Sequence, residues 1–114
     1  MVNWIIADDG KIRFELDLMK HAAWYTENNS KRKLCNDFLE GEVQVSTVFL
    51  GIDHGFRPSG PPVLWETMIF GGEYNNMQWR YTCRREAREN HARIVERLKA
   101  GLHPDGHTDV GTGD

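Results

Sequence analysis

The sequence reads Val43-Gln44-Val45-Ser46-Thr47-Val48-Phe49-Leu50 and, after a loop rich in glycine and proline, Val63-Leu64-Trp65-Glu66-Thr67-Met68-Ile69-Phe70. Side chains of a β-strand alternate between its two faces, and both runs are rich in β-branched and aromatic residues. Each run is largely apolar on both faces, which is typical of central strands. The two runs therefore predict neighbouring strands at the centre of a β-sheet.

Shorter runs on either side predict further strands. Residues 2–7 and 11–16 flank an Asp-Asp-Gly turn, so they predict a hairpin. Residues 77–81 alternate strictly after a turn-rich stretch and predict another strand. Residues 31–41 favour a short helix and an irregular connection equally, because their apolar residues match helical spacing and a glycine ends the segment.

Two helices are predicted. The first follows Asp17, which occupies an N-cap position, and its apolar residues recur at helical spacing as far as Tyr25. The second covers residues 84–100, with Thr82 as its expected N-cap and an apolar stripe of Ala87, His91, Ile94, Val95 and Leu98. We therefore expect an α+β fold, a mainly antiparallel β-sheet of about five strands with the two helices packed on one face.

The 114 residues are enough for one hydrophobic core. We assign residues 1–102 to a single α+β domain and the polar, glycine-rich residues 103–114 to a flexible C-terminal tail. A net charge of −3 argues against general nucleic-acid binding. No apolar stretch approaches the ~20 residues that span a bilayer, so we expect a cytoplasmic protein without membrane association. Cys35 and Cys83 are expected to be free thiols.

Asp53, His54 and Glu66 are the polar residues that stand out. Asp53-His54 follows the first central run, and Glu66 interrupts an apolar face of the second. Carboxylates and imidazole could bind a ligand, hold a divalent metal or act as acid and base. Alternatively, Asp53 accepts backbone N–H groups of the loop while His54 and Glu66 order the loop or face solvent. We assign no catalytic residue, no metal ligand and no cofactor.

Three further residues would complete a ligand-binding set with Asp53, His54 and Glu66. Phe56 and Trp65 offer rings that stack on a ligand, and Arg80 offers a guanidinium that clamps it. Arg80 is also the available cation for Glu66, which would be costly to bury alone.

Two basic clusters could hold an anion if the fold joins them: Lys31-Arg32-Lys33, and the group Arg84, Arg85 and Arg88. Arginine binds phosphate and carboxylate through paired N–H groups, so we assign Arg84, Arg85 and Arg88 as candidate anion-binding residues. The alternative is a solvated basic surface, because no glycine-rich phosphate loop accompanies them. His91 is predicted to be a hydrogen-bonded core histidine rather than a metal ligand.

Three motifs occur together in the chain: Val45-Ser46-Thr47-Val48-Phe49-Leu50-Gly51-Ile52-Asp53-His54, Gly60-Pro61-Pro62, and Trp65-Glu66-Thr67-Met68-Ile69-Phe70-Gly71-Gly72. With them the chain resembles a family of small uncharacterised proteins encoded by tailed phages and prophages. The resemblance covers roughly residues 42–98, including Arg80-Tyr81 and the helix with Glu86-Ala87 and His91. It implies a phage accessory context and transfers no functional residue.

The phage context and the absence of a catalytic motif favour a non-enzymatic anti-defence or host-takeover factor in the host cytoplasm. Its expected partner is a host immune protein or a nucleotide-type small molecule that it sequesters. The alternatives are a small metal-dependent or acid/base hydrolase using Asp53, His54 and Glu66, and a structural assembly protein. Homo-oligomerisation is expected in each case, because a small domain with so many rings can bury some of them between subunits.

Overall fold

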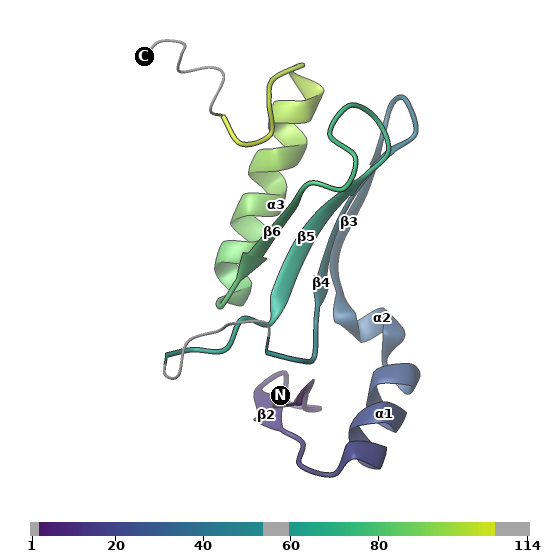
Figure 1. Cartoon of the computed structure of the whole chain (residues 1–114), viewed down its shortest axis with the longest axis vertical. Coiled ribbons are helices and arrows are strands. Elements are labelled where there is room, and N and C mark those ends of the chain that lie inside the picture. Colours follow the sequence, from purple (N-terminus) through teal and green to yellow (C-terminus); the bar gives the residue numbers. More distant parts are fainter. Residues whose placement is uncertain (1–2, 54–59, 107–114) are drawn as a thin grey trace.

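The main sheet is an antiparallel meander with one long helix along one face (Figure 1). The computed structural model describes residues 3–53 and 60–106. Its strands β3 (Lys33–Leu39), β4 (Val43–Phe49), β5 (Trp65–Phe70) and β6 (Gln78–Tyr81) pair in the order β3-β4-β5-β6. Helix α3 (Arg84–Lys99) contacts all four strands. The α+β prediction is confirmed, and its two central runs are the central strands β4 and β5.

The core lies between α3 and the face of the sheet that α3 covers. Thr47 pairs with Thr67, and Phe49 pairs with Trp65, so the alternate residues of β4 and β5 that point to α3 lie side by side. The predicted stripe of α3 is confirmed, since Ala87, His91, Ile94 and Val95 are buried against this face.

The other elements form a smaller unit at one end of the main sheet (Figure 1). Strands β1 (Trp4–Ile6) and β2 (Ile12–Phe14) pair as the predicted hairpin, and α1 (Leu18–Glu27) follows it. The Asp17 carboxylate caps α1 by accepting the N–H groups of Met19 and Lys20 at 2.9 and 3.1 Å. The described residues therefore form six strands in two sheets, compared with the expected single sheet of about five.

Helix α1 contacts β1 and the end of the main sheet, whereas the sequence suggested that it would share a face with α3. Trp24 meets the Phe49 ring edge-on, with 5.8 Å between ring centroids. The His21 ring is buried, and its Nε2 lies 3.1 Å from the carbonyl oxygens of both Trp4 and Gly51. These contacts fasten α1 to the hairpin and to the end of β4.

Residues 31–41 were expected to form a short helix or an irregular connection, but most of them form a strand. A one-turn helix, α2 (Asn29–Arg32), leads into β3, whose residues pair with β4 along its length. The backbone hydrogen bonds of this pairing outweigh the helical spacing of the apolar side chains. The glycine that suggested a helix end, Gly41, instead makes the hairpin turn with a φ of 79°.

The ends of α3 differ in one detail from the sequence prediction. Cys83, and not Thr82, is the N-cap residue, and its side chain makes no capping hydrogen bond. At the other end Gly101 adopts a φ of 76°, and Leu102 N–H donates to the Arg97 carbonyl at 2.9 Å, as expected for a glycine that ends a helix.

Residues 103–106 lie against α3 and β6. Arg97 Nε donates to the His103 carbonyl at 2.6 Å, and Trp79 Nε1 donates to the Asp105 carboxylate at 2.7 Å. Pro104 is fully buried. The remainder of the predicted tail, 107–114, lies outside the described residues.

Candidate functional site

The structure separates the residues of the predicted ligand-binding set. Trp65 is 5% exposed and points toward α3, where its ring packs against Phe49 at 5.7 Å between centroids. Glu66 and Arg80 point to the opposite face and form an ion pair, with Arg80 Nε 3.0 Å from Glu66 Oε2. Trp65 therefore does not stack on a ligand held by Glu66 and Arg80.

Asp53 has the loop-capping contact that the sequence offered as an alternative to ligand binding. Its Oδ1 accepts the Val63 N–H at 2.8 Å and so ties together the two ends of the connection between β4 and β5. His54 and Phe56 lie outside the described residues. Among residues 3–53 and 60–106, no group of three or more histidine, cysteine or acidic side chains could hold a metal ion.

The basic residues have separate surroundings. Arg84 donates to the Gly10 carbonyl at 2.8 Å and so joins the start of α3 to the N-terminal hairpin. Arg32 stacks over the Tyr25 ring at 3.6 Å. Arg85 and Arg88 are exposed on α3. Arg84 and Arg32 thus stabilise the fold, and Arg85 and Arg88 remain candidates for binding an anion.

A chain of hydrogen bonds crosses the core under α3. The prediction that His91 is a hydrogen-bonded core histidine is confirmed, whereas its partners were not predicted. His91 Nε2 lies 2.7 Å from the Asp37 carboxylate, and its Nδ1 lies 2.7 Å from the Thr47 hydroxyl. The chain continues from Thr47 to Thr67 at 2.5 Å and from Thr67 to the Tyr81 hydroxyl at 3.1 Å. Its signal in the sequence was a threonine in the middle of the buried face of each central strand.

One direction of donation satisfies every member of this chain. Asn90 Nδ2 donates to Tyr81, whose hydroxyl donates to Thr67, and Thr67 donates to Thr47. Thr47 then donates to His91 Nδ1, and His91 Nε2–H donates to Asp37. We call Asn90, Tyr81, Thr67, Thr47, His91 and Asp37 the buried polar chain.

The order acid, histidine, hydroxyl is that of hydrolase triads, but the hydroxyl here cannot meet a substrate. Thr47 is 0% exposed, between β3, β5 and α3. Burial also raises the pKa of the neighbouring Cys35 thiol, so this cysteine stays protonated at neutral pH. The buried polar chain therefore stabilises the core and offers no nucleophile to a substrate.

The face of the sheet opposite α3 has no helix over it in the described part of the chain (Figure 1). Phe38 and Phe70 lie on either side of Gln44 on this face, and they are 73% and 42% exposed. The Glu66–Arg80 ion pair joins β5 and β6 farther along this face. We call this surface the uncovered face; its residues are Asn36, Phe38, Gln44, Ser46, Val48, Glu66, Met68, Phe70, Gln78 and Arg80.

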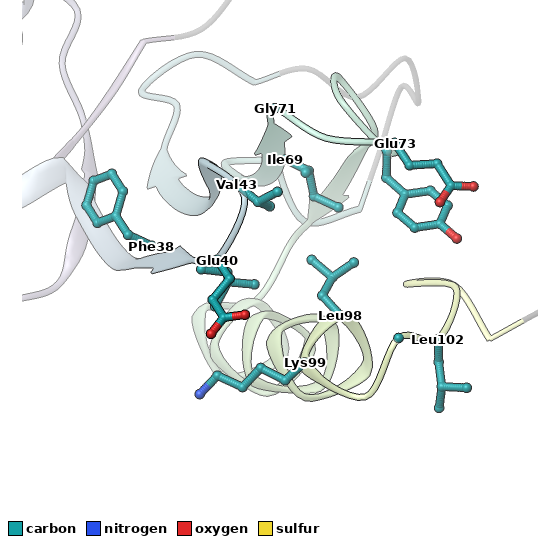
Figure 2. A pocket seen from close by; sticks show the side chains of 12 residues that line it. Phe38, Glu40, Val43, Ile69, Gly71, Glu73, Leu98, Lys99 and Leu102 are labelled. Carbon is teal, nitrogen blue, oxygen red and sulfur yellow. The ribbon is translucent and has the colours of Figure 1, made fainter.

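A pocket of about 620 Å³ lies between the end of the sheet and the last turn of α3 (Figure 2). Val43 and Ile69 from the strands and Leu98 from the helix converge on it, and Glu40 and Glu73 stand on opposite sides. Gly71 also lines the pocket, and its φ of 88° and its closeness to the Glu42 carbonyl oxygen leave no room for a Cβ at this position. The pocket lies at the end of β4 and β5 away from Asp53.

Three comparisons with known proteins found no match to this chain. A scan against protein-family models gave no match, and searches of curated proteins and of solved structures also gave none. No helix within residues 3–53 and 60–106 is long and apolar enough to cross a bilayer.

Proposed function

We propose that the protein is a phage- or prophage-encoded accessory factor that binds a host immune protein in the cytoplasm, without catalysis, through the uncovered face. The observation that carries this proposal is the exposure of Phe38 and Phe70 on a helix-free sheet face. Phe38, Phe70 and Arg80 share this face, and aromatic residues and arginine are enriched at the centres of protein interfaces.

The alternative of sequestering a nucleotide-type ligand has less support from the charges. Glu40 and Glu73 flank the pocket and would repel a phosphate group, while Lys99, which also lines the pocket, extends away from its centre (Figure 2). Arg84, one of the candidate anion-binding residues, donates to a backbone carbonyl instead.

The hydrolase alternative also has less support than binding. It requires Asp53, His54 and Glu66 to act on one substrate, whereas Glu66 pairs with Arg80 and Asp53 closes the loop through Val63. A metal-dependent hydrolase needs several histidine, cysteine or acidic side chains that can hold one metal ion. The described part of the chain contains no group of three or more such side chains.

Phage plating on bacteria that each carry one defence system tests the proposal. The wild-type protein, expressed in the host, is expected to restore plating on at least one strain, and the Phe70→Glu variant is expected to lose this effect. Ala92→Glu is the matched control, because it adds the same charge at an exposed position of α3. Calorimetry with the purified host protein then measures binding directly.

Two results would overturn the proposal. The first is that Phe70→Glu protects phages as well as the wild type while circular dichroism shows the same fold. The second is that no defence system is affected and the purified chain hydrolyses a substrate with a rate that falls when Glu66 is replaced by Gln.

A further inference from the structure

Residues 103–106 form a turn that is docked on α3 and β6. Gly106 N–H donates to the His103 carbonyl at 3.1 Å and closes the turn, and Asp105 N–H donates to His103 Nδ1 at 3.0 Å. Proline in the second position and glycine in the fourth are typical of such a turn. Because these hydrogen bonds lie within the four residues, the segment holds its own shape, and we call it the docked turn.

Two arginines of α3 hold the backbone of the docked turn. Arg97 Nε donates to the His103 carbonyl at 2.6 Å. Arg93, one helical turn earlier, donates from Nη1 to the Pro104 carbonyl at 3.1 Å. Arginine carries hydrogen-bond donors only, so both guanidinium groups require an acceptor on the segment that lies against them.

Strand β6 supplies the third donor. Trp79 Nε1 donates to the Asp105 carboxylate at 2.7 Å, and the indole nitrogen is likewise a donor only. Pro104, which precedes Asp105, is fully buried. The three donors therefore match two carbonyl oxygens and one carboxylate around a buried proline. We call Trp79, Arg93 and Arg97 the turn-binding site.

The charges around the turn-binding site favour one carboxylate over a run of carboxylates. Its two arginines are positive, but Glu86 and Glu89 line a shallow pocket together with Arg93, and Glu96 is exposed on the same helix. These glutamates would repel additional acidic side chains of a ligand, whereas the Asp105 carboxylate is met by the indole N–H. The ligand that fits is thus a proline followed by a single aspartate, as in the docked turn itself.

The docked turn occupies the site as an intramolecular ligand. It follows a short connection after α3, and Figure 1 shows the chain turning back beside the helix. A short connection gives an attached ligand an effective concentration on the order of millimolar or more. A free ligand with the same contacts therefore competes poorly, and it displaces the turn only if it makes further contacts of its own.

We propose that the turn-binding site is a docking site for a proline–aspartate turn of a partner protein, and that residues 103–106 occupy it until such a turn displaces them. A second copy of the chain is not the expected ligand, because each copy supplies a turn to its own site. The site lies on α3 and β6, on the covered side of the sheet, so the proposal does not depend on the uncovered face.

A peptide with the sequence of residues 102–106, blocked at both ends, is the probe. In the full chain, the open variant Pro104→Gly with Asp105→Ala removes the buried ring and the carboxylate, so that the site loses its own ligand. The open variant is expected to bind the peptide at least about tenfold more tightly than the wild type does. NMR of the Trp79 indole N–H measures binding, and the peptide should return this resonance toward its wild-type position.

Controls separate specific docking from general attraction. A peptide with alanine in place of both proline and aspartate should lose most of the binding, as should the open variant that also carries Arg97→Met. Arg85→Met in the open variant removes the same charge at an exposed position of α3 outside the site, and it should bind the peptide like the open variant. Trp79→Phe identifies the indole resonance among those of the four tryptophans.

Circular dichroism establishes that the variants are folded. Asp105→Ala alone, which keeps the buried proline, is the second variant and should show the same difference from the wild type to a smaller extent. Three outcomes would overturn the proposal: folded open variants that do not bind the peptide, equal binding by the wild type and the open variant, and unchanged binding when Arg97 is replaced. A dimer of the open variant with the wild type, seen in sedimentation velocity, would overturn the choice of a different protein as the partner.

Discussion

The polar groups on the two faces of the main sheet differ in their access to water and in their hydrogen-bond partners. Under α3 the hydroxyls of Thr47 and Thr67 and the ring of His91 have no access to water, and each is bonded within the buried polar chain. On the uncovered face Glu66 and Arg80 pair with each other while both retain contact with solvent. Because an unsatisfied polar group is costly only when water is excluded, changes to the polar groups of the covered face should affect stability more than changes to those of the uncovered face.

Replacement of His91 by alanine should have the largest effect on stability, because it disrupts the hydrogen bonds of the covered face. It removes the acceptor of the Thr47 hydroxyl and the donor to Asp37, and it leaves a cavity under α3. We expect the free energy of unfolding to fall by about 3 to 4 kcal/mol, measured by urea denaturation. Arg85→Ala on the exposed side of the same helix is the control and should change it by less than about 0.5 kcal/mol. A similar loss in both variants would contradict this contrast.

The Tyr81 hydroxyl should give the covered face a dependence on alkaline pH. Burial raises the pKa of Tyr81 more than its hydrogen bonds with Thr67 and Asn90 lower it. The native state therefore holds this proton more tightly than the unfolded chain, so the contribution is complete below about pH 10 and is lost as the pH rises through the native pKa.

Urea denaturation at several pH values between about 8 and 11 measures this effect. Tyr81→Phe should lower stability by about 1 kcal/mol at neutral pH and should flatten the alkaline decline. Tyr74→Phe keeps the Tyr81 hydroxyl and is the control. An unchanged alkaline slope in Tyr81→Phe would show that the hydroxyl is solvated in the native state.

The ion pair of the uncovered face should contribute little. A double-mutant cycle with Glu66→Gln and Arg80→Met is expected to give a coupling energy of about 0.5 kcal/mol, because both partners keep water contact. The coupling should shrink further at about 1 M salt, where screening is strong. A coupling energy above about 2 kcal/mol would mean that this part of the face is dry in solution.

Phe38→Ser should have the smallest effect on stability. The side chain is mostly exposed, so the free energy of unfolding is expected to change by less than about 0.5 kcal/mol in urea denaturation. If a second copy of the chain covers this face in solution, the loss of stability will exceed about 1 kcal/mol and will depend on protein concentration.

Local patterns in the sequence were enough to predict much of the scaffold. Alternation identified β4 and β5, helical spacing identified the buried stripe of α3, and the position of Asp17 identified the start of α1. For the candidate site, the sequence predicted the pairing of Glu66 with Arg80 and the capping role of Asp53 as alternatives, and both contacts are present.

The tertiary structure decided which of these residues share a surface. Residues 65 and 66 are neighbours in the chain but point to opposite faces of β5, so Trp65 joined the core and Glu66 did not. Asp37 and His91 are 54 positions apart in the sequence, and they meet because Asp37 lies in β3. The sequence did not predict this strand, since the apolar residues of 31–41 match helical spacing. The pocket lined by Val43, Ile69 and Leu98 could likewise not be predicted from the sequence, because exposure depends on what the rest of the chain covers. Periodicity is a local property that each segment carries by itself, whereas burial and pairing arise only when distant segments compete for the same partners.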